Sequence, residues 1–156
     1  MPTPRKKIVL AFGTFDYIHP GHKYYLEQAR RYGDALIVVV ARDSTVKEAK
    51  KHFPIRDEET RLTAVKRLRP VTKAALGSES DYYRVLDAFK PEVIALGYDQ
   101  KFLTRNLKKE LKRRRLRTQI VRIDAYQPEQ YKSSIIKGAE HKISRKNKND
   151  QRPLKP

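Results

Sequence analysis

The segment Ala35–Ala41 reads ALIVVVA and has no polar residue for either face of a strand. A strand at a surface alternates apolar and polar residues, whereas a strand covered by helices on both faces is apolar throughout. Further strand-length apolar runs lie at Ile8–Phe12, Val93–Gly97 and Gln119–Ile123, with a weaker one at Val71–Leu76. These runs predict a five-stranded, mainly parallel sheet between two layers of helices.

The segments between the runs have helical character. Pro20–Tyr32 places Tyr24, Tyr25, Leu26 and Ala29 about an apolar stripe, and Asp57–Leu68 begins with acidic residues that suit a helix N-terminus. Regular alternation of strand and helix is typical of right-handed crossovers between parallel strands. The chain is therefore predicted to adopt an α/β, Rossmann-like three-layer fold.

Polar clusters follow four of the five runs. They are Gly13-Thr14-Phe15-Asp16, Arg42-Asp43-Ser44, Gly97-Tyr98-Asp99-Gln100 and Asp124-Ala125-Tyr126. Since the carboxyl ends of parallel strands meet at one edge of a sheet, these clusters are expected on a single rim. Ligands of such folds bind at that rim, near the point where the strand order reverses.

Composition limits the classes of protein to consider. The chain has 156 residues, enough for one domain over residues 1–137, and it has no cysteine for disulfides or thiolate chemistry. No run approaches the ~20 apolar residues of a membrane span, and the first residues, MPTPRKK, lead into a strand rather than a signal peptide. We therefore expect a cytoplasmic protein without a membrane partner.

The net charge of +18 raises nucleic-acid binding as an alternative function. Eight basic residues and one acidic residue lie between Arg105 and Arg117, and seven basic and two acidic residues lie in 137–156. No aromatic residue is interleaved with the arginines to stack on bases. We interpret the first segment as a solvated cationic helix and residues 138–156 as a basic, flexible tail.

The segment LAFGTFDYIHPGH is the strongest functional signal in the chain. Gly13 offers a place where a phosphate can approach the backbone, and Pro20 suits the first turn of a helix. His19 and His22, three residues apart, then lie on one face of that turn, where an anion is favoured. Zinc binding by the two histidines is the alternative, but no matching cluster of further ligands accompanies them.

The strand–GTFD–HPGH–helix arrangement resembles the HxGH signature of the nucleotidyltransferase superfamily. The pieces VVVARDSTVK, LGSESDYYRVLDAFKPEVIALGYDQ and KSSII, in that order, resemble archaeal FAD synthases in particular. The resemblance implies an FMN adenylyltransferase that joins ATP and FMN, assisted by a divalent cation, Mg²⁺, carried by the nucleotide. It also implies that no metal ligand need come from the protein.

The same resemblance implies a set of nucleotide-binding residues. His19 and His22 are the catalytic pair, with Pro20 and Gly21 between them, while Gly13, Thr14 and Phe15 bring the backbone to the phosphates. Asp99 and Tyr126 contact the nucleotide at later strand ends, and Ser133 and Ser134 bind pyrophosphate at a helix start. Softer candidates for phosphate binding are Lys23, Arg42 and Arg61, while Asp16 is expected either to organise the loop or to help hold the metal. Lys47, Lys50 and Lys51 are expected in a loop over the nucleotide.

Two questions stay open in the sequence. A CTP-dependent cytidylyltransferase acting on a small phosphorylated alcohol is the alternative enzyme, although the chain matches only the end of the motif that cytidylyltransferases carry before their Ser/Thr pair. A homodimer is compatible with the sequence, which determines neither the oligomeric state nor the acceptor.

If the basic segments are only a solvated surface, mixed RNA should dissociate at moderate salt, because contacts to phosphates alone weaken steeply as salt rises. Filter binding across a salt series measures this. RNA binding that persists near physiological salt and is lost on removing residues 138–156, with enzymatic activity intact, would instead show a second function.

Overall fold

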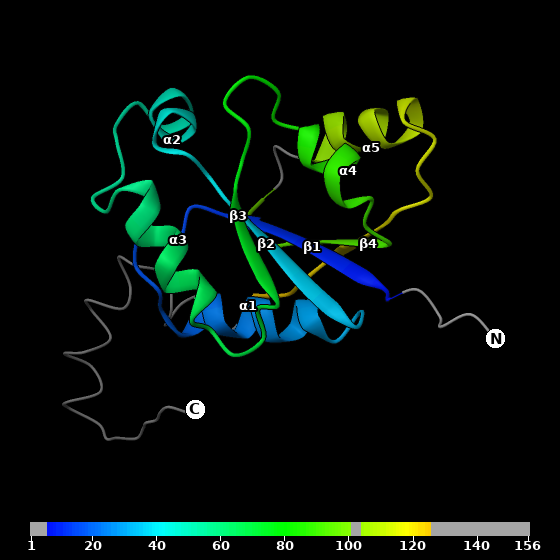
Figure 1. Ribbon diagram of the computed structural model, residues 1–156, viewed down its shortest axis with the longest axis horizontal. Coiled ribbons are helices and arrows are strands. Elements are labelled where there is room, and N and C mark those ends of the chain that lie inside the picture. Colours follow the sequence, from blue (N-terminus) through cyan, green and yellow to red (C-terminus); the bar gives the residue numbers. More distant parts are fainter. Residues whose placement is uncertain (1–5, 101–103, 126–156) are drawn as a thin grey trace.

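The computed structural model describes residues 6–100 and 104–125 of the chain. Strands and helices alternate along them almost as the sequence predicts (Figure 1). Their order is β1 (Ile8–Gly13), α1 (Pro20–Arg30), β2 (Ala35–Val40), α2 (Asp43–Lys50), α3 (Glu58–Lys66), β3 (Lys73–Leu76), α4 (Arg84–Phe89), β4 (Val93–Leu96), α5 (Thr104–Arg113) and β5 (Gln119–Arg122).

The five strands form one sheet in the order β3-β2-β1-β4-β5. Every neighbouring pair is parallel, so the predicted sheet is confirmed and is wholly rather than mainly parallel. The chain builds outward from β1 to β3 and then returns to the other side of β1 for β4 and β5. The strand order therefore reverses between β1 and β4, which places the expected ligand site at the carboxyl ends of those two strands.

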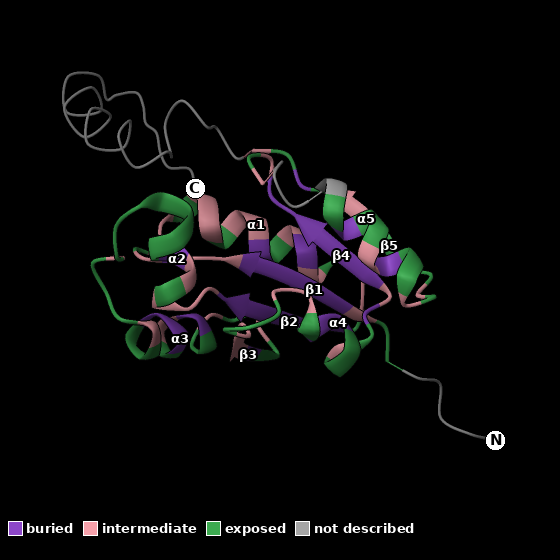
Figure 2. Ribbon diagram, turned by 90° about the horizontal axis from the view of Figure 1, so that it is seen from above, coloured by how far each residue is buried: buried purple, intermediate pink, exposed green. Residues whose placement is uncertain are grey.

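Two apolar clusters fill the two faces of the sheet. Val9 and Ala11 of β1 belong to a cluster with residues of α1 and α3, while Leu10 and Phe12 belong to one with residues of α4 and α5. Figure 1 shows α1 and α3 on one side of the strands and α4 and α5 on the other. Strands β1, β2 and β4 are buried almost throughout, the edge strands β3 and β5 are partly exposed, and the helices expose their outer faces (Figure 2). This arrangement confirms the three-layer prediction.

Some element boundaries differ from the predicted ones. Both predicted helices are shorter at their carboxyl ends, since α1 ends at Arg30 and α3 at Lys66. Lys47 and Lys50, expected in a loop, lie in helix α2. The cationic helix expected within 105–117 is α5, which is held to the sheet by buried Leu107 and Leu111. Within the described residues, no helix is long and apolar enough to cross a membrane.

The turn before β2 gives a test of the packing. A Cβ at Gly33 would lie 2.6 Å from the Lys7 carbonyl oxygen and 2.8 Å from Val9 Cγ2, whereas one at Gly77 would meet its nearest neighbour, Val39 Cγ1, at an ordinary 3.5 Å. Gly33→Ala should therefore lower the free energy of unfolding by about 1–3 kcal/mol through overpacking. Gly77→Ala is the matched control and should change it much less in urea denaturation. Equal effects of the two substitutions would contradict the packing described around Gly33.

Candidate active site at the start of helix α1

The HPGH segment begins α1, and its two histidines cap the helix. His19 is the N-cap residue, with an extended backbone, and Pro20 is the first helical residue, as predicted. Nδ1 of His19 accepts a hydrogen bond from the Gly21 amide at 3.1 Å, and Nδ1 of His22 accepts one from the His19 amide at 3.4 Å. This is a capping box in which histidines replace the usual Ser/Thr and Glu/Gln.

The two imidazole rings stack, with centroids 3.8 Å apart, so they share the predicted face. Because each Nδ1 atom accepts a hydrogen bond, a neutral ring carries its proton on Nε2. Burial lowers the pKa of His19. Burial, followed by the neighbouring charge of His19, lowers the pKa of His22 to about 4, against a backbone hydrogen bond with Tyr17 that raises it. Near pH 7 both rings are therefore neutral N–H donors.

Phe15 shapes the floor of this site. Its backbone has a left-handed φ of 56°, which is strained for a bulky residue, and its side chain is only 3% exposed. Its ring packs against the His22 ring at a centroid distance of 5.1 Å. A Cβ at Gly13 would lie 2.5 Å from the Phe15 ring. The close approach that requires glycine at position 13 is therefore that of the Phe15 ring, and the approach of a phosphate to the Gly13 backbone stays a prediction.

Tyr25 of α1 bridges the ends of β1 and β4. Pairing between these strands reaches Ala11 and Ala95. Where this pairing ends, the Tyr25 hydroxyl donates to the Ala95 carbonyl oxygen at 2.6 Å and accepts from the Phe12 amide at 3.3 Å. Burial raises the pKa of Tyr25, so the hydroxyl keeps its proton for this bridge. The sequence places Tyr25 on an apolar stripe and gives no signal for its polar role.

Gln100 makes a second bridge at the same point. Its side-chain amide donates to the Phe12 carbonyl oxygen at 2.8 Å and accepts from the Gly97 amide at 2.9 Å. Asp99, beside it, is exposed at the rim, and its charge acts on His19 in the direction that raises the pKa, although burial prevails. The predicted Asp99 is thus brought near the histidines, while the neighbouring Gln100 has the structural role that sequence reasoning missed.

Arg61 differs most from its predicted place. The sequence suggests a role in phosphate binding, but its side chain is fully buried and donates to the carbonyl oxygens of Thr14, Ala41 and Arg56 and to the Asp43 carboxylate. In this structure its guanidinium is committed to protein groups. The expectation that Arg61 contacts a phosphate is corrected to an internal role.

Asp16 and Arg42 also hold loops together. The two carboxylate oxygens of Asp16 accept from the Ile55 and Arg56 amides, each at 2.8 Å, which favours loop organisation over metal binding. Arg42 is 29% exposed, donates to the Gly77 carbonyl oxygen at 2.6 Å and pairs with Glu58. Lys23 is exposed on α1, and Thr14 lies between β1 and α1, so their roles toward a phosphate stay predictions. Tyr126, Ser133, Ser134 and the tail 138–156 lie outside the described residues.

Comparison with known proteins assigns the chain to a family. The family model described as cytidylyltransferase-like matches residues 10–139. A protein named FAD synthase from Archaeoglobus profundus is 50% identical over 131 residues, which cover 83% of each chain. Another FAD synthase, from Methanothermobacter thermautotrophicus, is 49% identical over 136 residues, 84% of this chain and 89% of its relative. The chain belongs to the FAD synthase family.

Solved structures agree with this membership. A lipopolysaccharide core biosynthesis protein from Thermoplasma volcanium is 41% identical, with a TM-score of 0.74 over 78% of this chain and 99% of the other. A pantothenate synthetase from Thermus thermophilus, at 14% identity and a TM-score of 0.61, shares the fold alone, over 84% of this chain and 61% of the other. The chain is therefore a nucleotidyltransferase-type enzyme with a Rossmann-like fold, as its HPGH motif predicts.

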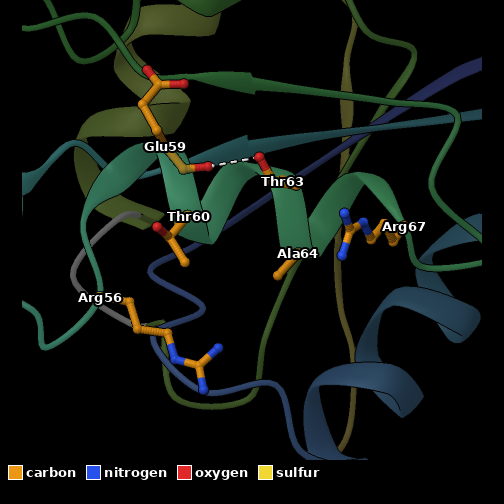
Figure 3. A pocket seen from close by; sticks show the side chains of 6 residues that line it. All are labelled: Arg56, Glu59, Thr60, Thr63, Ala64 and Arg67. Atoms are coloured by element: carbon orange, nitrogen blue, oxygen red, sulfur yellow. Dashed lines mark hydrogen bonds between the residues drawn. The ribbon is translucent and has the colours of Figure 1, made fainter.

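A cavity of about 360 Å³ lies along α3 (Figure 3). Arg56 and Arg67 lie toward its two ends, and Thr63 Oγ1 donates to the Glu59 carbonyl oxygen at 2.9 Å. None of its lining residues comes from the HPGH segment or from a strand. The cavity therefore shares no residue with the predicted site at the start of α1.

Two substitutions at His19 separate its capping role from its chemistry. Asn is a good N-cap, so His19→Asn should leave the free energy of unfolding within about 0.5 kcal/mol of the wild type, whereas His19→Ala should lower it by about 1 kcal/mol. Both variants lose the imidazole donor, and both should lose roughly 100-fold or more in turnover. Urea denaturation and single-turnover kinetics measure the two effects.

The matched control is His52→Asn, since His52 is exposed and lies outside the capping box. It should keep a turnover close to that of the wild type. Near-normal turnover of His19→Asn would show that His19 only caps the helix.

Proposed function

We propose that this protein is an ATP:FMN adenylyltransferase that forms FAD and pyrophosphate. The observation that carries the proposal is the stacked pair His19 and His22 at the α1 N-terminus, placed where the strand order reverses, in a chain about half identical to proteins named FAD synthase. A CTP-dependent cytidylyltransferase is the second candidate, favoured by the description of the family model. The names of the relatives support the first.

In the proposed reaction a phosphate oxygen of FMN attacks the α-phosphorus of ATP. The new bond joins the two phosphates of FAD, and the bond from the α-phosphorus to the bridging oxygen breaks, so that pyrophosphate leaves with that electron pair. No covalent intermediate with the protein is required. The protein must hold the two substrates in line and stabilise the negative charge that grows on the transferred phosphate.

The described residues suit that task. The Nε2–H group of neutral His19 and the positive end of the α1 dipole offer donors to phosphate oxygens. The N–H group of His22 donates to the Tyr17 backbone and would exchange that hydrogen bond for one to a phosphate oxygen. A neutral donor pays less desolvation cost than a charged one in a half-buried site. We assign His19 and His22 to the transition state, the backbone of Thr14 and Phe15 to the phosphates, and Asp99 to the nucleotide.

A divalent cation fits this site as part of the nucleotide. In the part of the chain that the structure describes, no three His, Cys, Asp or Glu residues gather to hold a metal. Mg²⁺ commonly binds substrate phosphates and keeps several waters. We propose that Mg²⁺ arrives on the triphosphate, where it neutralises part of the charge, while the chain positions the nucleotide.

The test is a matrix of nucleotides and acceptors. The purified protein with Mg²⁺ should consume ATP and FMN and release equal amounts of FAD and pyrophosphate, measured by chromatography and a pyrophosphate assay. CTP with FMN, and ATP with glycerol phosphate, should give little pyrophosphate. Transfer from CTP to a small phosphorylated alcohol, with no FAD from ATP and FMN, would establish the second candidate instead.

A further inference from the structure

Arg61 is the only charged side chain classed as buried in the part of the chain that the structure describes, and its exposed fraction is 0%. Removing a guanidinium from water is costly unless every contact compensates. Its position in α3 does not offset this desolvation cost, because Arg61 lies within about one turn of the helix N-terminus, where the dipole disfavours a positive charge. Its contacts outside α3 must therefore account for it.

Those contacts join separate segments at the carboxyl edge of the sheet. One terminal nitrogen of the guanidinium donates to the Thr14 carbonyl oxygen at 2.8 Å and to the Ala41 carbonyl oxygen at 2.7 Å. The other pairs with Asp43 at 2.7 Å, and Nε donates to the Arg56 carbonyl oxygen at 2.9 Å. The segments after β1, after β2 and before α3 thus converge on one planar group.

Two further hydrogen bonds hold the β1–α1 loop against the segment before α3. Asp16, two residues after Thr14, accepts from the Ile55 and Arg56 amides. The β1–α1 loop is therefore tied to the segment before α3 at Thr14, through Arg61, and at Asp16 directly. This loop leads from Phe15 to His19 within four residues, so its position sets where the capped histidines stand relative to the ends of β1 and β2.

We propose that Arg61 is a positioning residue of the nucleotidyl-transfer site, acting through Thr14 and the β1–α1 loop and not by touching a phosphate. The inference rests on the proposed function for its kinetic consequence. A planar fork with donors in fixed directions meets three carbonyls and one carboxylate together, which a lysine ammonium does not reproduce. Small displacements of positioned groups cost up to about 100-fold in rate.

The test compares Arg61→Lys and Arg61→Met with the same substitutions at Arg67, an exposed arginine at the C-cap of α3. With FMN, ATP and Mg²⁺, at a temperature where each variant is folded by circular dichroism, Arg61→Lys should lower kcat by about 10- to 100-fold with a smaller change in the KM for ATP. Arg67→Lys and Arg67→Met should match the wild type. An unchanged kcat of folded Arg61→Lys, with only a lower denaturation midpoint, would overturn the proposal.

A ligand-free measurement makes the two proposals separable. In nuclear magnetic resonance spectra, Arg61→Lys should shift the amide signals of Thr14 and Phe15 and the imidazole signals of His19, whereas Arg67→Lys should not. Those signals test positioning even if the wild type makes no FAD, an outcome that would refute only the proposed function. If both Arg61 variants fail to fold, Asp43→Asn, which weakens the ion pair, should shift the same signals, and their constancy would overturn the proposal.

Discussion

Strand β1 is the element on which the rest of the molecule depends. It pairs with β2 along its whole length and with β4 along half of it, and its residues alternate between the two apolar clusters. A slip of one residue would exchange its two faces, so the side chains of both clusters would have to repack, and this favours the observed register. Pairing and packing therefore hold the carboxyl end of β1 in place, and the loop that leads to the histidines starts from this end.

Around the carboxyl end of β1, polar side chains replace missing backbone pairing. Where β1 and β4 separate, Tyr25 and Gln100 satisfy the backbone groups of Phe12. Where the β1 and β2 loops separate, Arg61 satisfies carbonyl oxygens on both. Buried backbone groups are costly when unpaired, so each opening in the sheet edge needs such a side chain. The result is a rim whose loops are joined by side-chain hydrogen bonds.

Much of the architecture follows from local patterns along the chain. The run at Ala35–Ala41 and its counterparts predict the strands, because a doubly covered strand must be apolar throughout, and the HPGH motif predicts a helix start with two histidines on one face. Helix ends are less well predicted, as at Arg30 and Lys66, since fraying and capping there depend on neighbours. Arg61 shows the larger difficulty: a residue type suited to phosphate serves the protein interior equally well.

The sequence by itself determined the five parallel strands, the edge at which polar residues collect and the histidine pair that begins α1, because periodicity and turn chemistry act over a few residues. Only the tertiary structure decided what each polar residue at that edge does. Whether Arg61 faces solvent or three loops depends on segments distant in sequence. Such roles follow from which groups packing leaves without partners, and no local pattern encodes that.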